Sequence, residues 1–359
     1  ALRWEDLRSD TDLGAVHQDR WTSVYEATYS QTSADPLFHV VGWNSSYDDL
    51  PLPQDQLREL IEGTTDRIRT LHPTRLLELG CGTGLLLLRL LPGLERCIAS
   101  DPAPTGLAHI SRVVAGDSRF TGKTPDLRVA TADADLKLNP RSLDLAMVNS
   151  VVQCFPDEPY LRSVITERML ALVAEGGSVF LGDCRNLRLQ AAFHASIAAH
   201  RADPDLKGHQ ILWRIRSGLA LESQLLVDPR YFTNLGRDLG DVDIRILLKR
   251  GRSGNEMLAF RYDAIISRRK AREPAQQQLP HRTGATPAEQ LAQVRGQRAV
   301  IMGIPNARVA RWIRLAQAVE DRPDDRWGDI LAEIPSTGHE PEDWHAAAET
   351  LGMAIELSW

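Results

Sequence analysis

The sequence contains 359 residues, of which 43% are hydrophobic and 25% are charged, as in a globular protein with one large domain and an appendage. Its formal net charge is −6, so it lacks the basic excess that indicates nucleic-acid binding. The four cysteines lack the spacing of a metal site or a disulfide framework, and no run approaches the roughly 20 apolar residues of a membrane span. We therefore expect a cytoplasmic protein with reduced cysteines that binds no nucleic acid, no membrane and no metal.

The first segment, residues 1–72, is expected to form a helical lid. Side chains that recur at i, i+3, i+4, i+7 and i+8 share one helix face, and here they are Trp21, Val24, Tyr25, Thr28 and Tyr29. A turn-rich aromatic stretch follows at residues 38–47. A second helix is predicted over residues 54–70.

Strand and helix patterns then alternate over residues 73–269. The predicted strands span residues 75–79, 97–100, 127–131, 143–149, 178–183, 243–249 and 257–267. The predicted helices are one beginning at Gly84, 104–115, 158–174 with Gly176 and Gly177 as its stop, and 187–201. This alternation predicts a mostly parallel twisted sheet with helices on both faces.

The remainder of the sequence reads as a linker and a small C-terminal α/β extension. Residues 270–287 are polar and contain proline, as linkers do. The extension, residues 288–359, is predicted to contain a strand at 299–302 and a helix at 306–320. A further helix from Pro341 to Gly352 and a final strand at 353–359 complete it.

A glycine-rich loop follows the first strand of this alternation directly. Gly80, Gly82 and Gly84 have the spacing Gly-x-Gly-x-Gly, which differs from the Gly-x-Gly-x-x-Gly of dinucleotide folds. Glycine lets the backbone turn sharply and approach a ligand closely. Free amides in such a loop suit a carboxylate, and Glu78, just before it, suits an ammonium.

Acidic and amide side chains end the next strands. Asp101, about 20 residues after the first glycine, stands where an acid accepts both hydroxyls of a ribose. Asp133 follows the third strand, where a carboxylate can accept from an adenine amino group, and Asp135 competes for that role. Asn149 ends the fourth strand and faces the crevice where such folds bind ligands. This pattern predicts a site for S-adenosylmethionine.

Four segments resemble a known family, the methyltransferase domains of modular polyketide synthases and nonribosomal peptide synthetases. They are Gly42-Trp-Asn-Ser-Ser-Tyr47, Leu77-Glu-Leu-Gly-Cys-Gly-Thr-Gly-Leu-Leu86, Val148-Asn-Ser-Val-Val-Gln-Cys-Phe-Pro156, and Lys249-Arg-Gly-x-x-x-Asn-Glu256 running into Phe260-Arg-Tyr-Asp263. The tail, from Gly303-Ile-Pro-Asn-Ala-Arg308 to Leu357-Ser-Trp359, also resembles that family's C-terminal extension. Cys154 departs from the pattern, because an aromatic residue is expected there.

The resemblance implies a Rossmann-like class I methyltransferase that converts S-adenosylmethionine to S-adenosylhomocysteine. It also implies a substrate held as a thioester on the phosphopantetheine arm of an acyl carrier protein, and adjacent domains of a synthase module as partners. It does not settle which atom receives the methyl group.

A histidine is the leading candidate for a catalytic base. His194 lies in the helix after the fifth strand, and the pKa of histidine is near working pH. A carboxylate would orient it, and the candidates are Glu222, Glu256 and Asp183. Asn255 is a candidate to hold a substrate hydroxyl or carbonyl.

Aromatic and amide residues of the first segment are candidates to line a lid that excludes water: Tyr25, Trp43 and Asn44. The histidine and carboxylate set favours O-methylation of a β-hydroxyl on a carrier-tethered polyketide chain. N-methylation of an aminoacyl thioester is the alternative, and C-methylation is favoured less. A degenerate domain that only binds its neighbours, and an enzyme acting on a free small molecule, are further alternatives.

Overall fold

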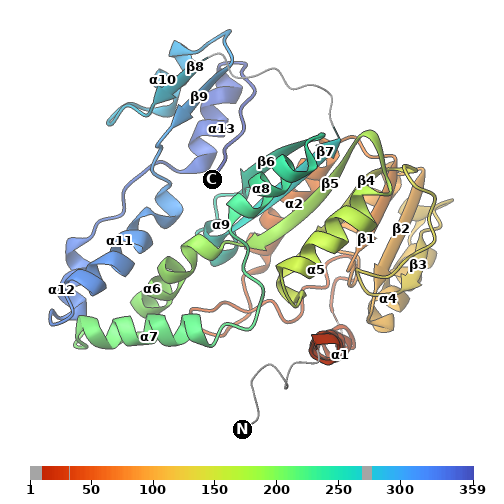
Figure 1. Cartoon of the computed structure of the whole chain (residues 1–359), viewed down its shortest axis with the longest axis horizontal. Coiled ribbons are helices and arrows are strands. Elements are labelled where there is room, and N and C mark those ends of the chain that lie inside the picture. The colour runs from red at the N-terminus through yellow and green to blue at the C-terminus, as the bar shows by residue number, and fades with distance from the viewer. Residues whose placement is uncertain (1–9, 32, 269–276) are drawn as a thin grey trace.

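The computed structural model describes residues 10–31, 33–268 and 277–359. One seven-stranded sheet has the order β3-β2-β1-β4-β5-β7-β6 (Figure 1). Its strands are β1 Arg75–Leu79, β2 Arg96–Asp101, β3 Asp126–Val129, β4 Leu143–Asn149, β5 Val173–Arg185, β6 Val242–Leu248 and β7 Arg261–Arg268. β1 to β5 pair in parallel, and β7 pairs antiparallel with both β5 and β6. The predicted mostly parallel sheet is confirmed.

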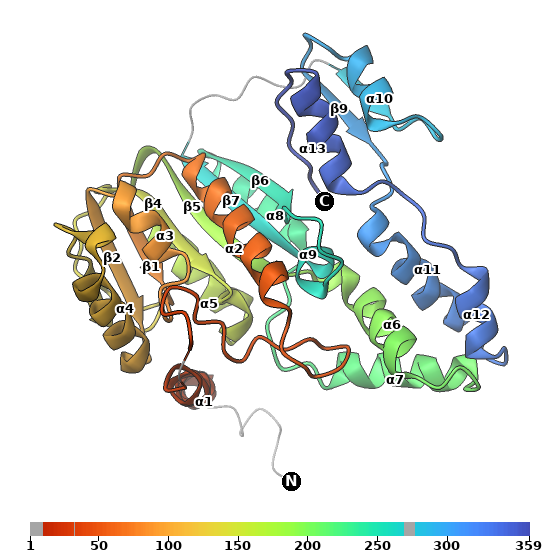
Figure 2. The ribbon, with the colours of Figure 1, turned by 180° about the vertical axis from the view of Figure 1, so that it is seen from behind.

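Helices cover both faces of the sheet, as Figures 1 and 2 show from opposite sides. The helices up to β7 are α1 Asp10–Tyr29, α2 Gln54–Arg69, α3 Leu87–Leu90, α4 Pro104–Gly116, α5 Glu158–Ser163, α6 Gln190–Arg201, α7 Gly208–Ala220, α8 Pro229–Leu239 and α9 Glu256–Phe260. One apolar core joins α2, α3 and α4 to the sheet, and the other joins α5 and α8 to its opposite face. Strands buried on both faces are nearly continuous apolar runs, as in β1 and β4.

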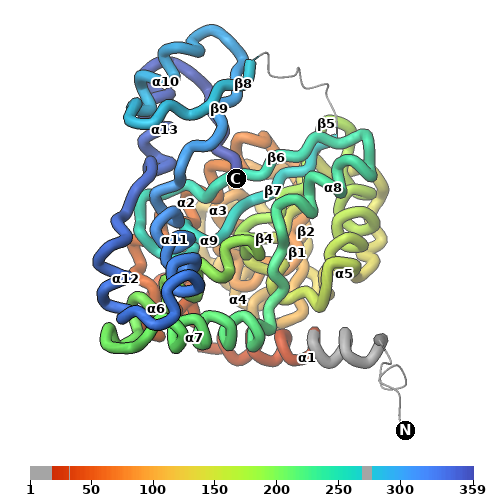
Figure 3. The backbone as a smooth tube through the Cα atoms, turned by 60° about the vertical axis from the view of Figure 1, so that its left-hand side comes forward, coloured from red at the N-terminus to blue at the C-terminus, as the bar shows by residue number. Residues whose placement is uncertain are grey.

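The C-terminal part divides between two packing units. Its elements are β8 Gln277–Pro280, α10 Pro287–Gln293, β9 Ala299–Met302, α11 Ala307–Asp321, α12 Trp327–Glu333 and α13 Pro341–Thr350. β8 and β9 form a two-stranded parallel sheet, and α10 packs beside α13 around Leu291 and Trp344. α11 and α12 instead lie beside α6 and α7 (Figure 3) and share an apolar cluster with them that includes Trp327. Two helices of the predicted small α/β extension, α11 and α12, therefore pack on α6 and α7 and not on the two-stranded sheet.

Two glycines that were predicted to stop a helix lie instead within a strand. The helix that begins as α5 continues as a π-helix, Val164–Leu170, and ends there. β5 already begins at Val173, and its register with β4 shifts between Leu143 and Leu145. Gly176 has a φ of +78°, and a Cβ on Gly177 would lie 2.6 Å from the carbonyl oxygen of Asp144. The two glycines therefore accommodate an irregular stretch of strand.

Other boundaries also differ from the prediction. Residues 257–260, predicted as strand, belong to α9, because Asn255 caps this helix by accepting the Leu258 N–H. β8 occupies residues 277–280, where a linker was predicted; residues 270–276 lie outside the described part. Residues 353–359 form no strand, and the Leu248 N–H donates to the Leu357 carbonyl there. In the described residues no helix is both long and apolar enough to cross a membrane.

Candidate functional site

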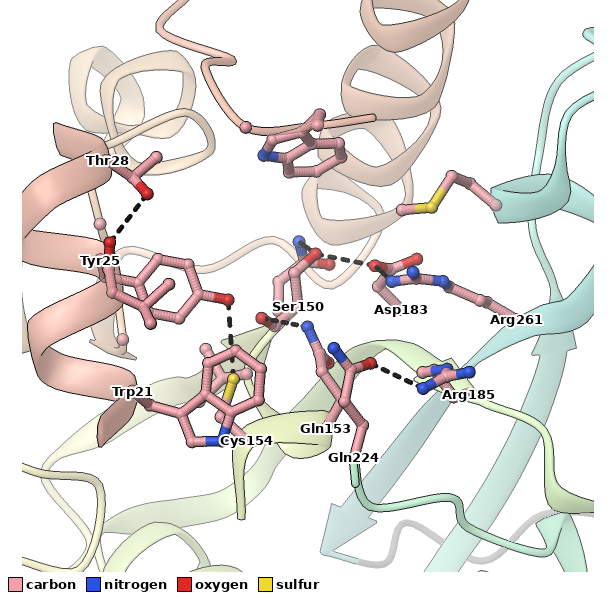
Figure 4. Close-up of a pocket in the computed structure, with 18 of the residues that line it drawn as sticks. Trp21, Tyr25, Thr28, Ser150, Gln153, Cys154, Asp183, Arg185, Gln224 and Arg261 are labelled. Carbon is pink, nitrogen blue, oxygen red and sulfur yellow. Dashed lines mark hydrogen bonds and ion pairs between the residues drawn. The ribbon is translucent and has the colours of Figure 1, made fainter. Parts of the chain in front are cut away.

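A cavity of about 720 Å³ lies at the carboxyl ends of β1, β4 and β5. Its walls come from α1, the loop after α1, the glycine loop after β1 and the segment after β4. α6, the residues between α7 and α8, and α9 close its other end. Figure 4 shows side chains from these distant segments converging on one space. Open α/β sheets bind their ligands at this edge.

The glycine loop makes the tight turn that the sequence predicts. Gly80, Gly82 and Gly84 have φ angles of +74°, +54° and +84°. A Cβ on Gly80 would lie 2.5 Å from Val151 Cγ2, and one on Gly82 would lie 2.7 Å from the Tyr29 hydroxyl. Gly80 and Gly82 line the cavity, whereas Gly84 packs against α4. Any side chain at the first two positions would fill space between the loop and its neighbours.

Two buried carboxyl groups flank the loop and line the cavity. Glu78 is 3% exposed, and its Oε2 has no hydrogen-bond partner among the described residues. Burial, reinforced by Asp101, raises the pKa of Glu78 well above its ordinary value. Asp101 accepts the N–H groups of Gly82 and Ala103 at 2.8 and 2.9 Å, and burial raises its pKa. An unpartnered carboxyl beside a glycine cradle fits the amino-acid end of S-adenosylmethionine.

The two acids predicted for the adenine end lie outside the cavity lining. The Asp133 carboxylate accepts the Tyr160 hydroxyl at 2.8 Å, and Tyr160 rather than Asp133 faces the cavity. Burial opposes ionisation of Asp133, but hydrogen bonds from Thr131 and Tyr160 lower its pKa. Asp135 is exposed and pairs with Lys137 at 2.6 Å. Thr131, Ala132 and Tyr160, rather than the two predicted acids, line this part of the cavity.

A set of polar side chains that the sequence analysis did not group surrounds Ser150. We call Asn149, Ser150, Gln153 and Asp183 the Ser150 cluster, and all four line the cavity (Figure 4). The Ser150 hydroxyl donates to Asp183 Oδ2 at 2.8 Å and receives Asn149 Nδ2 at 3.2 Å. Gln153 Nε2 donates to the Ser150 carbonyl at 2.7 Å. Arg261 also pairs with Asp183 Oδ2, at 2.6 Å.

His194 faces the cavity from α6, on the side away from the glycine loop. Burial lowers the pKa of its imidazole, although Glu222 opposes this shift. Glu222 pairs with Arg185 at 2.7 Å and accepts Gln190 at 2.9 Å. Gln190 Nε2 lies 3.3 Å from His194 Nε2. Gln190 therefore lies between Glu222 and His194 and contacts both, whereas Glu222 forms its ion pair with Arg185.

The other two predicted catalytic residues have structural partners. Both carboxylate oxygens of Glu256 bind Ser46, one its N–H at 2.9 Å and the other its hydroxyl at 2.8 Å. Glu256 lines the cavity and ties the loop after α1 to α9. Asn255 caps α9 and donates to Gln56 at 3.1 Å. Because Asn255 does not line the cavity, its predicted contact with a substrate is not available in this structure.

The side chains that were predicted to form a lid all line the cavity. Trp21, Tyr25 and Tyr29 stack in sequence along α1, with ring centroids 5.9 and 5.5 Å apart. The Tyr25 hydroxyl lies 3.6 Å from Cys154 Sγ (Figure 4). Trp43 and Asn44 also line the cavity. Cys154, where an aromatic residue was expected, therefore leaves room for the tyrosine of α1.

A buried charge network holds the far wall. Lys249 is 2% exposed and donates to Asp263 at 2.8 Å and to Thr64 at 3.0 Å. Arg67 pairs with the same aspartate, and the Asp183 N–H donates to it at 2.9 Å. Burial opposes ionisation of Asp263, but Lys249 and Arg67 lower its pKa. The resemblance includes Lys249 and Asp263 in one segment, but the sequence does not indicate that they pair with each other or with Arg67 and Thr64, since the members come from four separate elements.

Comparison with known proteins agrees with this geometry. Residues 77–181 match a family model described as a methyltransferase domain. Chondramide synthase cmdD of Chondromyces crocatus is 34% identical over 266 residues, which is 73% of this chain and 7% of that protein. The probable non-canonical nonribosomal peptide synthetase CymA of Salinispora arenicola is 30% identical over 292 residues, which is 81% of this chain and 4% of that protein. The chain spans less than a tenth of either relative.

The sheet order, the glycine cradle, the unpartnered Glu78 and the family match together define the class of this protein. It is a class I methyltransferase that uses S-adenosylmethionine. More narrowly, it belongs with the methyltransferase regions of large nonribosomal peptide and polyketide synthases.

Proposed function

We propose that this chain methylates the amine of an aminoacyl or peptidyl group that a carrier protein presents as a thioester. The observation that carries this proposal is a match to a probable nonribosomal peptide synthetase that extends over 81% of the chain at 30% identity. This class of enzyme is named for building peptides. The cavity supports it, because cofactor-side and acceptor-side residues line one continuous space. The carrier protein and the neighbouring domains of a synthase module are the partners that this reaction needs.

We assign the cofactor to the glycine-loop end of the cavity. We assign the ammonium to Glu78 and the ribose to Asp101. The amides of Gly80, Cys81, Gly82 and Gly84 already donate within the protein, so these four do not take the predicted role of binding the carboxylate. Asn149 faces the same end, and Tyr160, fixed by Asp133, borders the base. When bound, S-adenosylmethionine would supply an electrophilic methyl group. An N–C bond would form as the C–S bond breaks, S-adenosylhomocysteine would leave, and the resulting ammonium would release its proton to water. Trp43 and Asn44, with Tyr25, exclude water.

The cysteine chemistry supports the same setting. No disulfide joins any of the four cysteines, all of which lie in the described part of the chain, and three of them are buried. Free thiols are typical of reducing compartments, so we place the reaction in the cytoplasm.

O-methylation of a β-hydroxyl is a second candidate, and one observation favours it. The lowered pKa of His194 keeps its imidazole neutral at neutral pH, as a general base must be. A hydroxyl gains more from such a base than an amine does, because an amine already has a free electron pair when neutral. Glu222 and Gln190 would then hold His194 in place.

Two carrier proteins offered side by side decide between the candidates. One carries an aminoacyl group and the other a β-hydroxyacyl group of the same length, and mass spectrometry detects the added methyl. We expect transfer to the aminoacyl carrier, and His194→Ala to lower any transfer to the hydroxyacyl carrier by about 10²-fold or more. Transfer to the hydroxyacyl carrier alone would replace our first candidate by the second. Equal activity on a substrate without a carrier would contradict both.

A further inference from the structure

The Ser150 cluster leaves several acceptor oxygens unpaired. Asn149 Oδ1, Gln153 Oε1 and Asp183 Oδ1 are buried and have no hydrogen-bond partner in the part of the chain that the structure describes, although the other end of each side chain is bound within the cluster. Asp183 is 1% exposed and Gln153 is 7% exposed. Buried acceptors are costly unless something donates to them. Their arrangement therefore indicates a ligand with several donor hydrogens.

The fold holds these side chains at a cost, which argues against a merely incidental arrangement. Ser150 and Asp183 have φ angles of +55° and +64°, a region that residues with side chains rarely adopt. Gly182, paired with Asn149 across β4 and β5, has no side chain there, and a Cβ would lie 2.1 Å from Asn149 Oδ1. Strained residues cluster where geometry serves a ligand.

Neighbouring charges decide which oxygen of Asp183 stays unpaired. Arg261 and the Ser150 hydroxyl both bind Oδ2, and the backbone N–H of Asp183 is bound by Asp263. Figure 4 shows Ser150, Asp183 and Arg261 in line at the cavity wall, with Gln153 below them. Asn149 Oδ1 lies against Gly182, so we take Asp183 Oδ1 and Gln153 Oε1 as the oxygens that a ligand would bind.

We propose that Asp183 Oδ1 and Gln153 Oε1 accept the two N–H groups of the acceptor amine and so leave its electron pair directed at the methyl group. This inference rests on the proposed function and specifies its substrate class. A neutral primary amine has two hydrogens to donate, whereas a hydroxyl has one. A pair of acceptors therefore selects an amine over a hydroxyl. In this arrangement Asp183 is a catalytic residue that holds the nucleophile, and His194 is not needed to activate it.

Calorimetry in the presence of S-adenosylhomocysteine tests this without turnover. The two ligands are an aminoacyl pantetheine amide and the matching acyl pantetheine amide that lacks the amine. We expect the wild-type protein to prefer the amine by about 10- to 100-fold. Asp183→Asn should abolish this preference, because Arg261 and Ser150 would draw the amide oxygen and turn its NH2 group toward the amine.

The control is Asp228→Asn, the same change at the N-cap of α8, outside the cavity lining. It should keep the wild-type preference. If Asp183→Asn fails to fold, Gln153→Leu provides the test, with a partial loss of the preference expected. Equal binding of both ligands by the wild type, or an undiminished preference in the variants, would overturn the inference alone. Binding of neither ligand by the wild type would instead count against the proposed function.

Discussion

At the scale of single residues, the glycine loop explains how one strand end becomes a cofactor site. Gly80 combines a φ of +74° with a neighbour, Val151, that an added Cβ would touch at 2.5 Å. Val151 belongs to the segment after β4, so the loop and that segment approach each other only because Gly80 lacks a side chain. The sequence predicts this turn, because glycine spacing after a buried strand is a local signal.

Gly80→Ala should weaken binding of S-adenosylhomocysteine by at least about tenfold, because the added Cβ would meet Val151 at 2.5 Å and displace the loop from the cavity wall, beyond the roughly 1–2 kcal/mol that a left-handed conformation costs alanine. Isothermal calorimetry measures the affinity. Gly122→Ala is the matched control, because Gly122 has a φ of +78° and open space around it. It should lower stability while leaving the affinity intact. A similar loss of affinity in both variants would show that general destabilisation is responsible.

We expect Glu78 to release a proton when the cofactor binds. Its pKa is raised by burial and by Asp101 in the free protein, and a nearby ammonium lowers a carboxyl pKa. A carboxyl group whose pKa falls on binding gives up its proton. The affinity should therefore rise with pH until the pH reaches the pKa that Glu78 has in the free protein. Calorimetry of S-adenosylhomocysteine binding in buffers of different ionisation enthalpy counts the protons. Glu78→Gln should remove this release; an unchanged proton count in the variant would assign it elsewhere.

The Ser150 cluster shows where sequence reasoning stops at this scale. The sequence predicts that Asn149 faces the crevice, because it ends a strand. It offers Asp183 only as a carboxylate that could orient His194. Their relation depends on the register between β4 and β5 and on positive φ angles at Ser150 and Asp183. Non-glycine residues carry no sequence signal for that conformation.

At the scale of elements, α11 links the C-terminal part to the cavity wall. Arg308, 6% exposed as a side chain, donates to the carbonyls of Lys249 and Gly251 at 2.8 and 2.5 Å and pairs with Glu340. These carbonyls belong to the loop that leads from β6 to α9. The family resemblance includes both the segment with Arg308 and the segment with Lys249 and Gly251. Only the structure shows that Arg308 binds the second segment.

Arg308→Ala should lower the free energy of unfolding by about 1–3 kcal/mol, because it leaves the carbonyls of Lys249 and Gly251 and the carboxylate of Glu340 without this donor. Urea denaturation measures the change. Gln317→Ala, an exposed position on the same helix, should change it by less than about 0.5 kcal/mol. Comparable losses in the two variants would contradict the role of Arg308 as the link.

Element boundaries were predicted where a local signal exists. β1, β4 and β9 match their predicted residues, since each is a short run with strong strand character. The apolar run at 257–267 gave no sign of its division into α9 and β7, because a buried helix turn and a buried strand look alike over a few residues. Only the cap at Asn255 marks the start of that helix.

At the scale of the whole molecule, one cavity collects residues from α1 to β7. The fold class was predictable from the alternation of strands and helices, whereas the packing of α11 and α12 on α6 and α7 was not. Such contacts join residues more than a hundred positions apart and depend on tertiary packing, which local patterns do not encode. The same limit applies to the acceptor side of the cavity.

One measurement tests the central claim most directly. A carrier protein loaded with a seryl thioester presents an amine and a β-hydroxyl on one substrate, and S-adenosylmethionine with a ¹³C-labelled methyl marks the product. Carbon NMR and fragmentation of the released product locate the label. Our account predicts that the label is on nitrogen, and that it is lost in Asp183→Asn. A label on oxygen, or no transfer by a protein that binds S-adenosylhomocysteine, would contradict it.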